Sequence, residues 1–430
     1  MIKFNDTIYA LSTPTGKSAL AVIRVSGKKS KKILQKLCSI KKIKPNSVKL
    51  TYFNLNKNII DQVLVTYFEK PKSFTGEEML EISCHGSTTI ILKISEALEQ
   101  QGLRLAEPGE FTRRALMNDK IDLVQAESLS DLINAETEKQ RSLAISNLSR
   151  GLSNFVEEII NNLKNILANT EALIDFVDED LPKNITNKIE EQKKNIIKKI
   201  EKELNNSEIS KPIREGYTVS IVGKPNTGKS SFINFISKKN ISIVTNIPGT
   251  TTDTVTSALD INGYKFTFID TAGLRKFKNK IEELGIKKTK EIMLKSDLNL
   301  VFLKKNEKEN YTFVKNKIFV RSKLDKRPKE EQDNSILHIS SLTGDGIIKL
   351  MKKIEKKLIK TKKNEPMFSR ERHKNIMKKV LNELKSIKKG DTLDVKAFKY
   401  REALQISLEI NERFDIENIL DIIFSDFCIG

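Results

Sequence analysis

Apolar residues along the chain follow two periods, and the change from one to the other separates its parts. Residues 1–118 contain short β-branched runs, such as 22–25 and 62–68, which predict strands mixed with helices. From about Asp122 the apolar residues step by three or four, which predicts amphipathic helices. The first apolar stripe is Leu148, Leu152, Phe155, Ile159, Leu163 and Ile166, and the second is Ile189, Ile196, Ile200 and Leu204.

The strand-like pattern returns after residue 212, and residues 366–430 are helical again. An α/β domain therefore interrupts a helical region. Because insertion is tolerated where the ends of the inserted domain lie close together, we expect the flanking helical stretches to form one discontinuous domain. The predicted parts are an α+β domain at 1–118, a helical domain at 119–212 and 364–430, and an α/β domain at 213–363.

Residues 223–230 (GKPNTGKS) match a phosphate-binding loop at every fixed position. They follow the β-branched run 218–222 and open a helical run, which is the context that such a loop requires. The glycines let successive backbone N–H groups point at a phosphate. Lys229 adds a charge between the β- and γ-phosphates, and Ser230 offers a hydroxyl to Mg²⁺. In this context a glycine-rich turn without a ligand is a poor alternative.

Two further motifs predict contacts to the metal and the γ-phosphate. Residues 270–273 (DTAG) end the strand 265–269, where a carboxylate can hold Mg²⁺ through water and the Gly273 amide can sense the γ-phosphate. Residues 249–253 (GTTTD) contain Thr251, which we predict to be the second Mg²⁺ ligand.

Two more motifs predict recognition of the base. Residues 322–325 (SKLD) end in Asp325, which can accept hydrogen bonds from both N1–H and N2–H of guanine, a pairing that adenine cannot make. Residues 340–342 (SSL) follow a strand and would close over the base. With the phosphate loop, the motifs predict a GTPase of the P-loop class.

The position after Gly273, which in many GTPases holds a water-orienting glutamine, is Leu274. Hydrolysis is therefore slow or uses other groups. A monovalent cation can replace an arginine finger, with Asn226 and backbone carbonyls of residues 245–250 as candidate ligands. Glu282 is a candidate to position water, although from the residues alone a solvated helix carboxylate is the favoured interpretation.

The composition of the chain says less about function than its motifs do. The net charge of +20 over 430 residues favours a polyanionic partner, above all nucleic acid, but lysines spread through a Lys-rich chain explain it equally well. Three cysteines without a C-x-x-C motif favour reduced thiols. No apolar run is long enough to span a bilayer, and no signal pattern is present. We therefore expect a soluble cytoplasmic protein.

Further motifs, combined with the nucleotide motifs, make essentially the whole chain resemble the MnmE (TrmE) family of bacterial tRNA-modification GTPases. The motifs that carry this resemblance are 73–77 (SFTGE), 85–86 (HG), 108–111 (PGEF), 118–120 (NDK), 174–176 (IDF), 223–231, 249–253, 270–275 (DTAGLR) and 427–430 (FCIG). The N- and C-terminal motifs are specific, because other GTPases of this class lack them.

The resemblance implies a Ras-like P-loop GTPase domain inserted in a discontinuous helical domain, preceded by an α+β folate-binding domain. It implies a homodimer joined through the N-terminal domains, which bind a 5-formyl or 5,10-methylene tetrahydrofolate. It also implies a heterotetramer with the FAD-containing protein MnmG. The two proteins add a (carboxymethyl)aminomethyl group to C5 of the wobble uridine (U34) of certain tRNAs. GTP hydrolysis is activated by K⁺, which drives dimerisation of the GTPase domains.

The resemblance also assigns residue roles. Asn226, Thr245, Ile247 and Thr250 are the implied K⁺ ligands, Ser230 and Thr251 bind Mg²⁺, Glu282 acts in catalysis through water, and Arg24, Glu81 and Lys120 contact folate. The GTP contacts expected from motifs and resemblance together are Asn226, Thr227, Gly228, Lys229, Ser230, Ser231, Thr245, Asn246, Ile247, Pro248, Gly249, Thr250, Thr251, Asp270, Thr271, Ala272, Gly273, Ser322, Lys323, Asp325, Ser340, Ser341 and Leu342. Without the resemblance, the three folate residues read as surface cations and a strand-edge carboxylate.

The chain departs from the family pattern at three places. Ser322 replaces the usual asparagine of the guanine motif, and Thr252 replaces an arginine. The sequence ends at Gly430, where the family usually continues with a lysine that contacts folate, so we expect weaker folate binding. Cys428 could be catalytic, but we favour a buried small hydrophobe.

Two other functions fit parts of the sequence. A ribosome-assembly GTPase switch explains the basic charge and the GTPase motifs, but not residues 1–118 or the Cys-containing tail; folate binding would discriminate between the two. A dynamin-like membrane GTPase is disfavoured, because no amphipathic basic helix with aromatic anchors is present.

Overall fold

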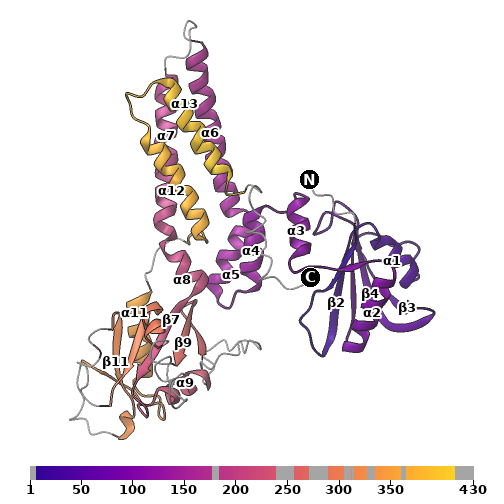
Figure 1. Ribbon diagram of the computed structural model, residues 1–430, viewed down its shortest axis with the longest axis horizontal. Helices are drawn as coiled ribbons and strands as arrows, with labels where there is room; N and C mark the ends of the chain where they lie inside the picture. Colours follow the sequence, from indigo (N-terminus) through magenta and orange to yellow (C-terminus); the bar gives the residue numbers. More distant parts are fainter. Residues whose placement is uncertain are drawn as a thin grey trace, which may run out of the picture. The chain divides into compact units, whose positions relative to one another are not determined.

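A computed structural model describes residues 6–176, 184–238, 256–270, 289–304, 311, 314–326, 335–359 and 365–411. Packing divides the chain into two compact units (Figure 1). Unit 1 comprises Met1–Ile133, Asn147–Val177 and Thr392–Gly430, and unit 2 comprises Asn134–Ser146 and Asp178–Asp391. None of the helices in the described ranges has an apolar stretch long enough to cross a membrane.

Unit 1 begins with a six-stranded sheet of order β3-β4-β5-β2-β1-β6. Neighbouring strands are antiparallel except for the parallel β1–β6 pair. The strands are β1 (Ile8–Leu11), β2 (Ser18–Ser26), β3 (Val48–Leu55), β4 (Asn58–Phe68), β5 (Met79–Gly86) and β6 (Arg104–Leu105).

The two faces of this sheet are covered differently. Side chains of α1 (Ser30–Leu37) and α2 (Thr88–Gln100) pack with the inward residues of β2, β4 and β5 into one apolar core. On the other face, Phe111 of α3 (Glu110–Met117) packs against Ile8 and Met79. Over β3 and β4 that face stays open, because Val48, Leu50 and Leu64 are 65%, 58% and 43% exposed.

The other helices in the described part of unit 1 are α4 (Leu123–Ile133), α6 (Gly151–Asp175) and α13 (Leu393–Leu408). Helices α6 and α13 lie side by side (Figure 1). Arg401 of α13 forms a 2.6 Å ion pair with Glu171 of α6. The predicted stripe is confirmed by the burial of Leu152, Ile159, Leu163 and Ile166.

The prediction of one continuous stripe is wrong at its start. Leu148 ends a separate helix, α5 (Glu138–Leu148), and Arg150 adopts φ of 68° before α6 begins. A left-handed residue cannot continue a right-handed helix, so α5 and α6 are separate helices. The apolar residues keep their three- or four-residue spacing across Arg150, so the spacing alone does not reveal that one helix ends and another begins there.

In unit 2, helix α7 (Ile185–Asn206) packs against α12 (Glu371–Ser386). The second predicted stripe is confirmed at Ile189, Ile196 and Ile200, which are buried, while Leu204 is half-buried. A 3₁₀ turn (Ser207–Ile209) and the short α8 (Ser210–Glu215) lead into the second sheet.

That sheet has the order β12-β11-β10-β7-β9-β8 and is parallel except for β8, which is antiparallel to β9. Its elements are β7 (Tyr217–Gly223), α9 (Lys229–Lys238), β8 (Thr256–Ile261), β9 (Tyr264–Asp270), a helical segment at 289–295, β10 (Leu298–Phe302), β11 (Lys317–Arg321), a 3₁₀ turn (Leu324–Lys326), β12 (Leu337–His338) and α11 (Ile347–Leu358). Because parallel strands end at the same edge, the residues at the carboxyl ends of β7, β9, β11 and β12 gather there.

Candidate nucleotide site

The backbone of the phosphate loop depends on glycine at two positions. Gly223 ends β7 with φ of +151°, and a Cβ on it would lie 2.3 Å from the carbonyl oxygen of Phe302 in β10. Gly228 has φ of +91°, and a Cβ there would lie 2.3 Å from the hydroxyl of Ser322. Side chains are thus excluded at both positions by conformation and by space. Between them, Asn226 also has a positive φ, of 61°.

Lys229 lies inside this loop. Its side chain is buried, and Nζ donates hydrogen bonds of 2.9 Å to the carbonyl oxygens of Gly223 and Lys224. These contacts hold the ammonium group at the loop itself. A phosphate bound by the loop amides would meet this charge, as the sequence motif predicts.

Ser230 and Asp270 meet at the start of α9 and the end of β9. The Ser230 hydroxyl donates a 3.1 Å hydrogen bond to Oδ2 of Asp270, whose side chain is buried. A hydroxyl and a carboxylate are hard oxygen ligands of the kind that Mg²⁺ prefers. The two residues therefore fit a magnesium site beside the phosphate loop.

Ser322 links the base side to the phosphate side. Its hydroxyl donates a 2.5 Å hydrogen bond to the carbonyl oxygen of Thr227, and the residue is buried. A serine hydroxyl is shorter than an asparagine amide and has one hydrogen to donate, so here it makes this one hydrogen bond to the loop. Thr227 is itself held by a 2.8 Å hydrogen bond from its hydroxyl to the carbonyl oxygen of Lys224.

Asp325 is oriented by Ser340, which is fully buried and donates a 2.6 Å hydrogen bond to Oδ1 of Asp325. The Ser340 hydroxyl also accepts hydrogen bonds from the backbone N–H groups of Leu342 and Thr343. The two motifs therefore form one rigid element that presents a carboxylate. The buried hydroxyl of Ser341 has no hydrogen-bond partner among the described residues.

The structure thus brings together the predicted residues from 226–231, Asp270, and the motifs at 322–325 and 340–342 at one edge of the sheet. Other predicted residues lie outside the described ranges. These are Thr245, Asn246, Ile247, Pro248, Gly249, Thr250, Thr251, Thr271, Ala272, Gly273, Glu282 and Cys428.

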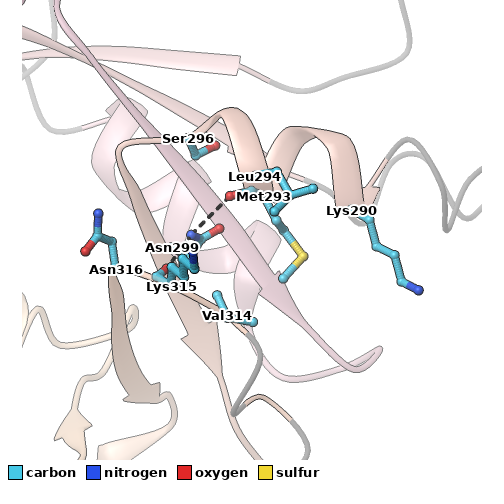
Figure 2. A pocket seen from close by; sticks show the side chains of 8 residues that line it. All are labelled: Lys290, Met293, Leu294, Ser296, Asn299, Val314, Lys315 and Asn316. Carbon is cyan, nitrogen blue, oxygen red and sulfur yellow. Dashed lines mark hydrogen bonds between the residues drawn. The ribbon is translucent and has the colours of Figure 1, made fainter.

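A separate cavity of about 420 Å³ lies at the opposite edge of the sheet (Figure 2). It is lined by Met293, Leu294 and Val314, together with Asn299 near the start of β10. The amide nitrogen of Asn299 donates to the carbonyl oxygens of Met293 and Lys315, at 3.3 and 3.0 Å. The cavity therefore lies away from the phosphate loop and is not the nucleotide site.

The folate candidates lie in unit 1. Arg24 of β2 and Glu81 of β5 are direct partners in the strand register, and Nε of Arg24 lies 2.8 Å from Oε1 of Glu81. Both side chains are about one third exposed. Lys120 is exposed and follows α3.

Near them is a cluster that the sequence did not reveal. The fully buried Arg114 contacts Glu110, Glu77 and Asp6, with nitrogen–oxygen distances of 2.8, 3.1 and 2.8 Å. The i,i+4 spacing of Glu110 and Arg114 predicts one of these pairs, but only on a helix surface. Their burial follows from tertiary packing.

A mostly parallel sheet with a phosphate loop after β7, a buried carboxylate at the end of β9 and a base-binding motif after β11 defines a P-loop GTPase. Comparison of the sequence with known families identifies which one. The family described as the MnmE helical domain matches residues 123–428, and the GTP-binding protein TrmE N-terminus matches residues 7–120. The chain belongs to the MnmE family of tRNA-modification GTPases.

Full-length relatives agree with this assignment. The tRNA modification GTPase MnmE of Fervidobacterium nodosum is 39% identical, covering 99% of this chain and 97% of the relative. Those of Thermotoga petrophila and Clostridioides difficile are each 35% identical over 99% of this chain, and 100% and 99% of the relatives. The G domain of the T. maritima FeoB iron transporter, at 22% identity, covers 33% of this chain and 99% of that one. Its TM-score of 0.26 supports no further conclusion.

Proposed function

We propose that this GTP hydrolase of a tRNA-modification family is activated by K⁺ and acts with the FAD-containing protein MnmG. Together they add a (carboxymethyl)aminomethyl group to C5 of the wobble uridine (U34) of certain tRNAs. The observation that carries the GTPase part is the convergence of Lys229, Ser230–Asp270 and Ser340–Asp325 at one sheet edge. Family membership carries the tRNA part.

The geometry supports a division of labour within the nucleotide site. The loop amides and Lys229 bind the phosphates, and the carboxylate of Asp325 selects guanine through N1–H and N2–H. Ser230 and Thr251 would hold Mg²⁺, with Asp270 beside Ser230. When bound, Mg²⁺ supplies positive charge that neutralises the phosphate oxygens.

Groups other than a glutamine carry out hydrolysis, because Leu274 follows Gly273. Asn226, Thr245, Ile247 and Thr250 would hold K⁺, which supplies the charge that an arginine finger gives elsewhere. Glu282 orients the attacking water. Of these, Asn226 lies in the described phosphate loop.

The open sheet face supports the proposed homodimer. Strand register places Val48, Thr66, Glu81 and Arg24 in one row across β3, β4, β5 and β2, and Leu50, Leu64 and Ser83 in the next row. Directly opposed residues share a face of the sheet. The exposed apolar residues and the Arg24–Glu81 pair therefore lie on the same face, so a partner that covers the apolar patch also approaches the candidate folate residues.

The donor set also suits a reduced folate. A carboxylate such as that of Glu81, held by Arg24 at 2.8 Å, can accept hydrogen bonds from an aminopyrimidinone ring, and Lys120 can pair with a carboxylate of the ligand's tail. A homodimer, a heterotetramer with MnmG, the four-part domain division predicted from the sequence and a cytoplasmic location complete the proposal.

The decisive experiment is mass spectrometry of wobble nucleosides from cells that lack this protein. We expect the C5 modification to disappear, to return with the wild-type gene and to stay absent with Lys229→Ala. Lys349→Ala, an exposed lysine on α11, is the matched control and should restore modification. Unchanged nucleosides together with a defect in ribosomal subunits would instead favour the ribosome-assembly function.

A further inference from the structure

The connection between β4 and β5 packs onto the segment that carries Lys120. Gly76 in this connection has φ of +76°, and a Cβ on it would lie 3.1 Å from Cβ of Asn118 and 3.1 Å from Cγ of Lys120. The aliphatic stem of Lys120 therefore lies against Gly76. Because the lysine stem rests on backbone rather than extending freely, the direction of its ammonium group is restricted.

The backbone at Lys120 is fixed from two sides. The side-chain amide of Asn118 donates a 2.7 Å hydrogen bond to the carbonyl oxygen of Thr75, and the N–H of Lys120 donates to the carbonyl oxygen of Ala115 at 2.9 Å. Asp119, between them, has φ of 56°. Asn118 is thus the side chain that joins the Lys120 turn to the β4–β5 connection.

Thr75 is held in turn by a buried chain of hydroxyl and carboxylate groups. The hydroxyls of Thr75 and Ser26 are 2.7 Å apart, and that of Ser26 donates to Oε2 of Glu77 at 2.7 Å. Because a hydroxyl has one hydrogen, Thr75 must donate to Ser26. Ser26 lies two residues after Arg24 on β2, so the chain of hydrogen bonds runs from the Arg24 strand to the Lys120 turn.

Arg114 completes the arrangement from α3. It pairs with Glu77 at 3.1 Å and with Glu110 at 2.8 Å, and its side chain is fully buried. Burial by itself lowers the pKa of Arg114, but the acidic partners raise it above its ordinary value, so the group stays charged. Helix α3 ends at Met117, directly before Asn118, and is thereby tied to the β4–β5 connection.

We propose that Asn118 is a positioning residue for the anionic tail of a reduced folate. Asn118 holds Lys120 in place by its hydrogen bond to Thr75, and Thr75 is in turn supported by the network of Ser26, Glu77 and Arg114. This inference rests on the proposed folate-binding function and extends it to residues that make no contact with the ligand. Lys120 touches the ligand carboxylate, and Asn118 fixes the turn from which Lys120 extends.

Isothermal titration calorimetry of the full chain with 5-formyltetrahydrofolate tests this in a double-mutant cycle of Asn118→Ala and Lys120→Ala. Asn118→Ala removes one hydrogen bond at an exposed residue, so we expect about tenfold weaker binding and a fall in melting temperature too small to account for it. Because Asn118 acts through Lys120, adding Asn118→Ala to Lys120→Ala should cause no further loss. The matched control is Gln100→Ala, an exposed side-chain amide on α2, which should bind as the wild type does.

The outcomes separate the two proposals. If the wild-type chain gives no heat with the folate, the proposed folate function is overturned and this inference with it. If the wild type binds and Asn118→Ala binds equally well, or if the two losses are additive, the positioning role alone is wrong. A fall in melting temperature that accounts for the weaker binding would also overturn it, because the role would then be structural.

Discussion

The two six-stranded sheets differ in how their faces are covered, and this difference places their sites. In the GTPase sheet every residue of β10 is buried, as expected for parallel strands with helices on both faces. In the N-terminal sheet β4 alternates between buried and exposed positions. A sheet covered on both faces can bind only at its edges, in the loops after its strands. A sheet with one open face can bind through the face itself.

The largest expected effect concerns the nucleotide site at the edge of the GTPase sheet. Replacing K⁺ by Na⁺ should slow GTP hydrolysis by ~10³-fold if the cation takes the place of an arginine finger. Steady-state phosphate release in matched salts measures this. Asn226→Ala should remove the difference between the salts while nucleotide binding persists. Equal wild-type rates in both salts would show that GTP hydrolysis does not need K⁺.

Glu282→Ala tests whether the edge site includes a residue outside the described ranges. We expect the variant to bind GTP and to dimerise its GTPase domains, but to hydrolyse about 10²-fold more slowly, because a water-orienting carboxylate is lost. Single-turnover hydrolysis with a fluorescent GTP analogue separates binding from chemistry. Near-normal turnover would show that Glu282 does not act in catalysis and is a solvated helix carboxylate.

Leu50→Lys tests whether the open face of the N-terminal sheet is the dimer interface. Leu50 is 58% exposed on β3, and burying the remaining apolar area contributes roughly 1 kcal/mol per copy, or about 30-fold in the dimer dissociation constant for two copies. Analytical ultracentrifugation measures the change. Leu92→Lys on α2, where the leucine is 63% exposed, is the control and should leave the dimer intact. Equal weakening by both variants would contradict the assignment of the interface to the open face.

The Arg114 cluster predicts how the N-terminal sheet responds to acid. Burial raises the pKa of Glu110, but hydrogen bonds from Arg104, the Glu107 amide and Arg114 outweigh it and lower the pKa below its ordinary 4.5. A carboxyl group whose pKa is lower in the folded than in the unfolded protein stabilises the fold at pH above its unfolded-state pKa. This stabilisation is lost as the pH falls through the folded-state pKa. Thermal unfolding should therefore show stability falling below about pH 4.5, and Glu110→Gln should make that dependence shallower. An identical acid profile in the variant would contradict the ion-pair explanation.

The smallest expected effect is at Ser322, within the edge site. Its single hydrogen bond to the carbonyl oxygen of Thr227 suggests weak nucleotide binding with fast release. Ser322→Asn should slow GDP dissociation by about three- to tenfold, because one more hydrogen bond becomes possible. Preference for guanine should not change, since Asp325 is untouched. Stopped-flow release of a fluorescent GDP measures both, and an unchanged rate would show that Ser322 is not the weak point.

The sequence by itself determined the phosphate loop, the guanine motif and the amphipathic helices, since each depends on residues close together in the chain. Gly228 and Lys229 are set by local backbone geometry, and Ile189, Ile196 and Ile200 by helical period. The break at Arg150 was not predictable from apolar spacing, because the spacing continues through it.

Only the tertiary structure decided which distant groups meet. Ser322 reaches Thr227 and Ser340 reaches Asp325 because the parallel strands end at one edge. Arg114 is charged and yet fully buried because Asp6 and Glu77 come to it from two other segments, in addition to Glu110 on its own helix, and the linear spacing records only the Glu110 pair. Local backbone preferences are written in neighbouring residues, whereas the compensation of a buried charge depends on packing between segments far apart in the chain.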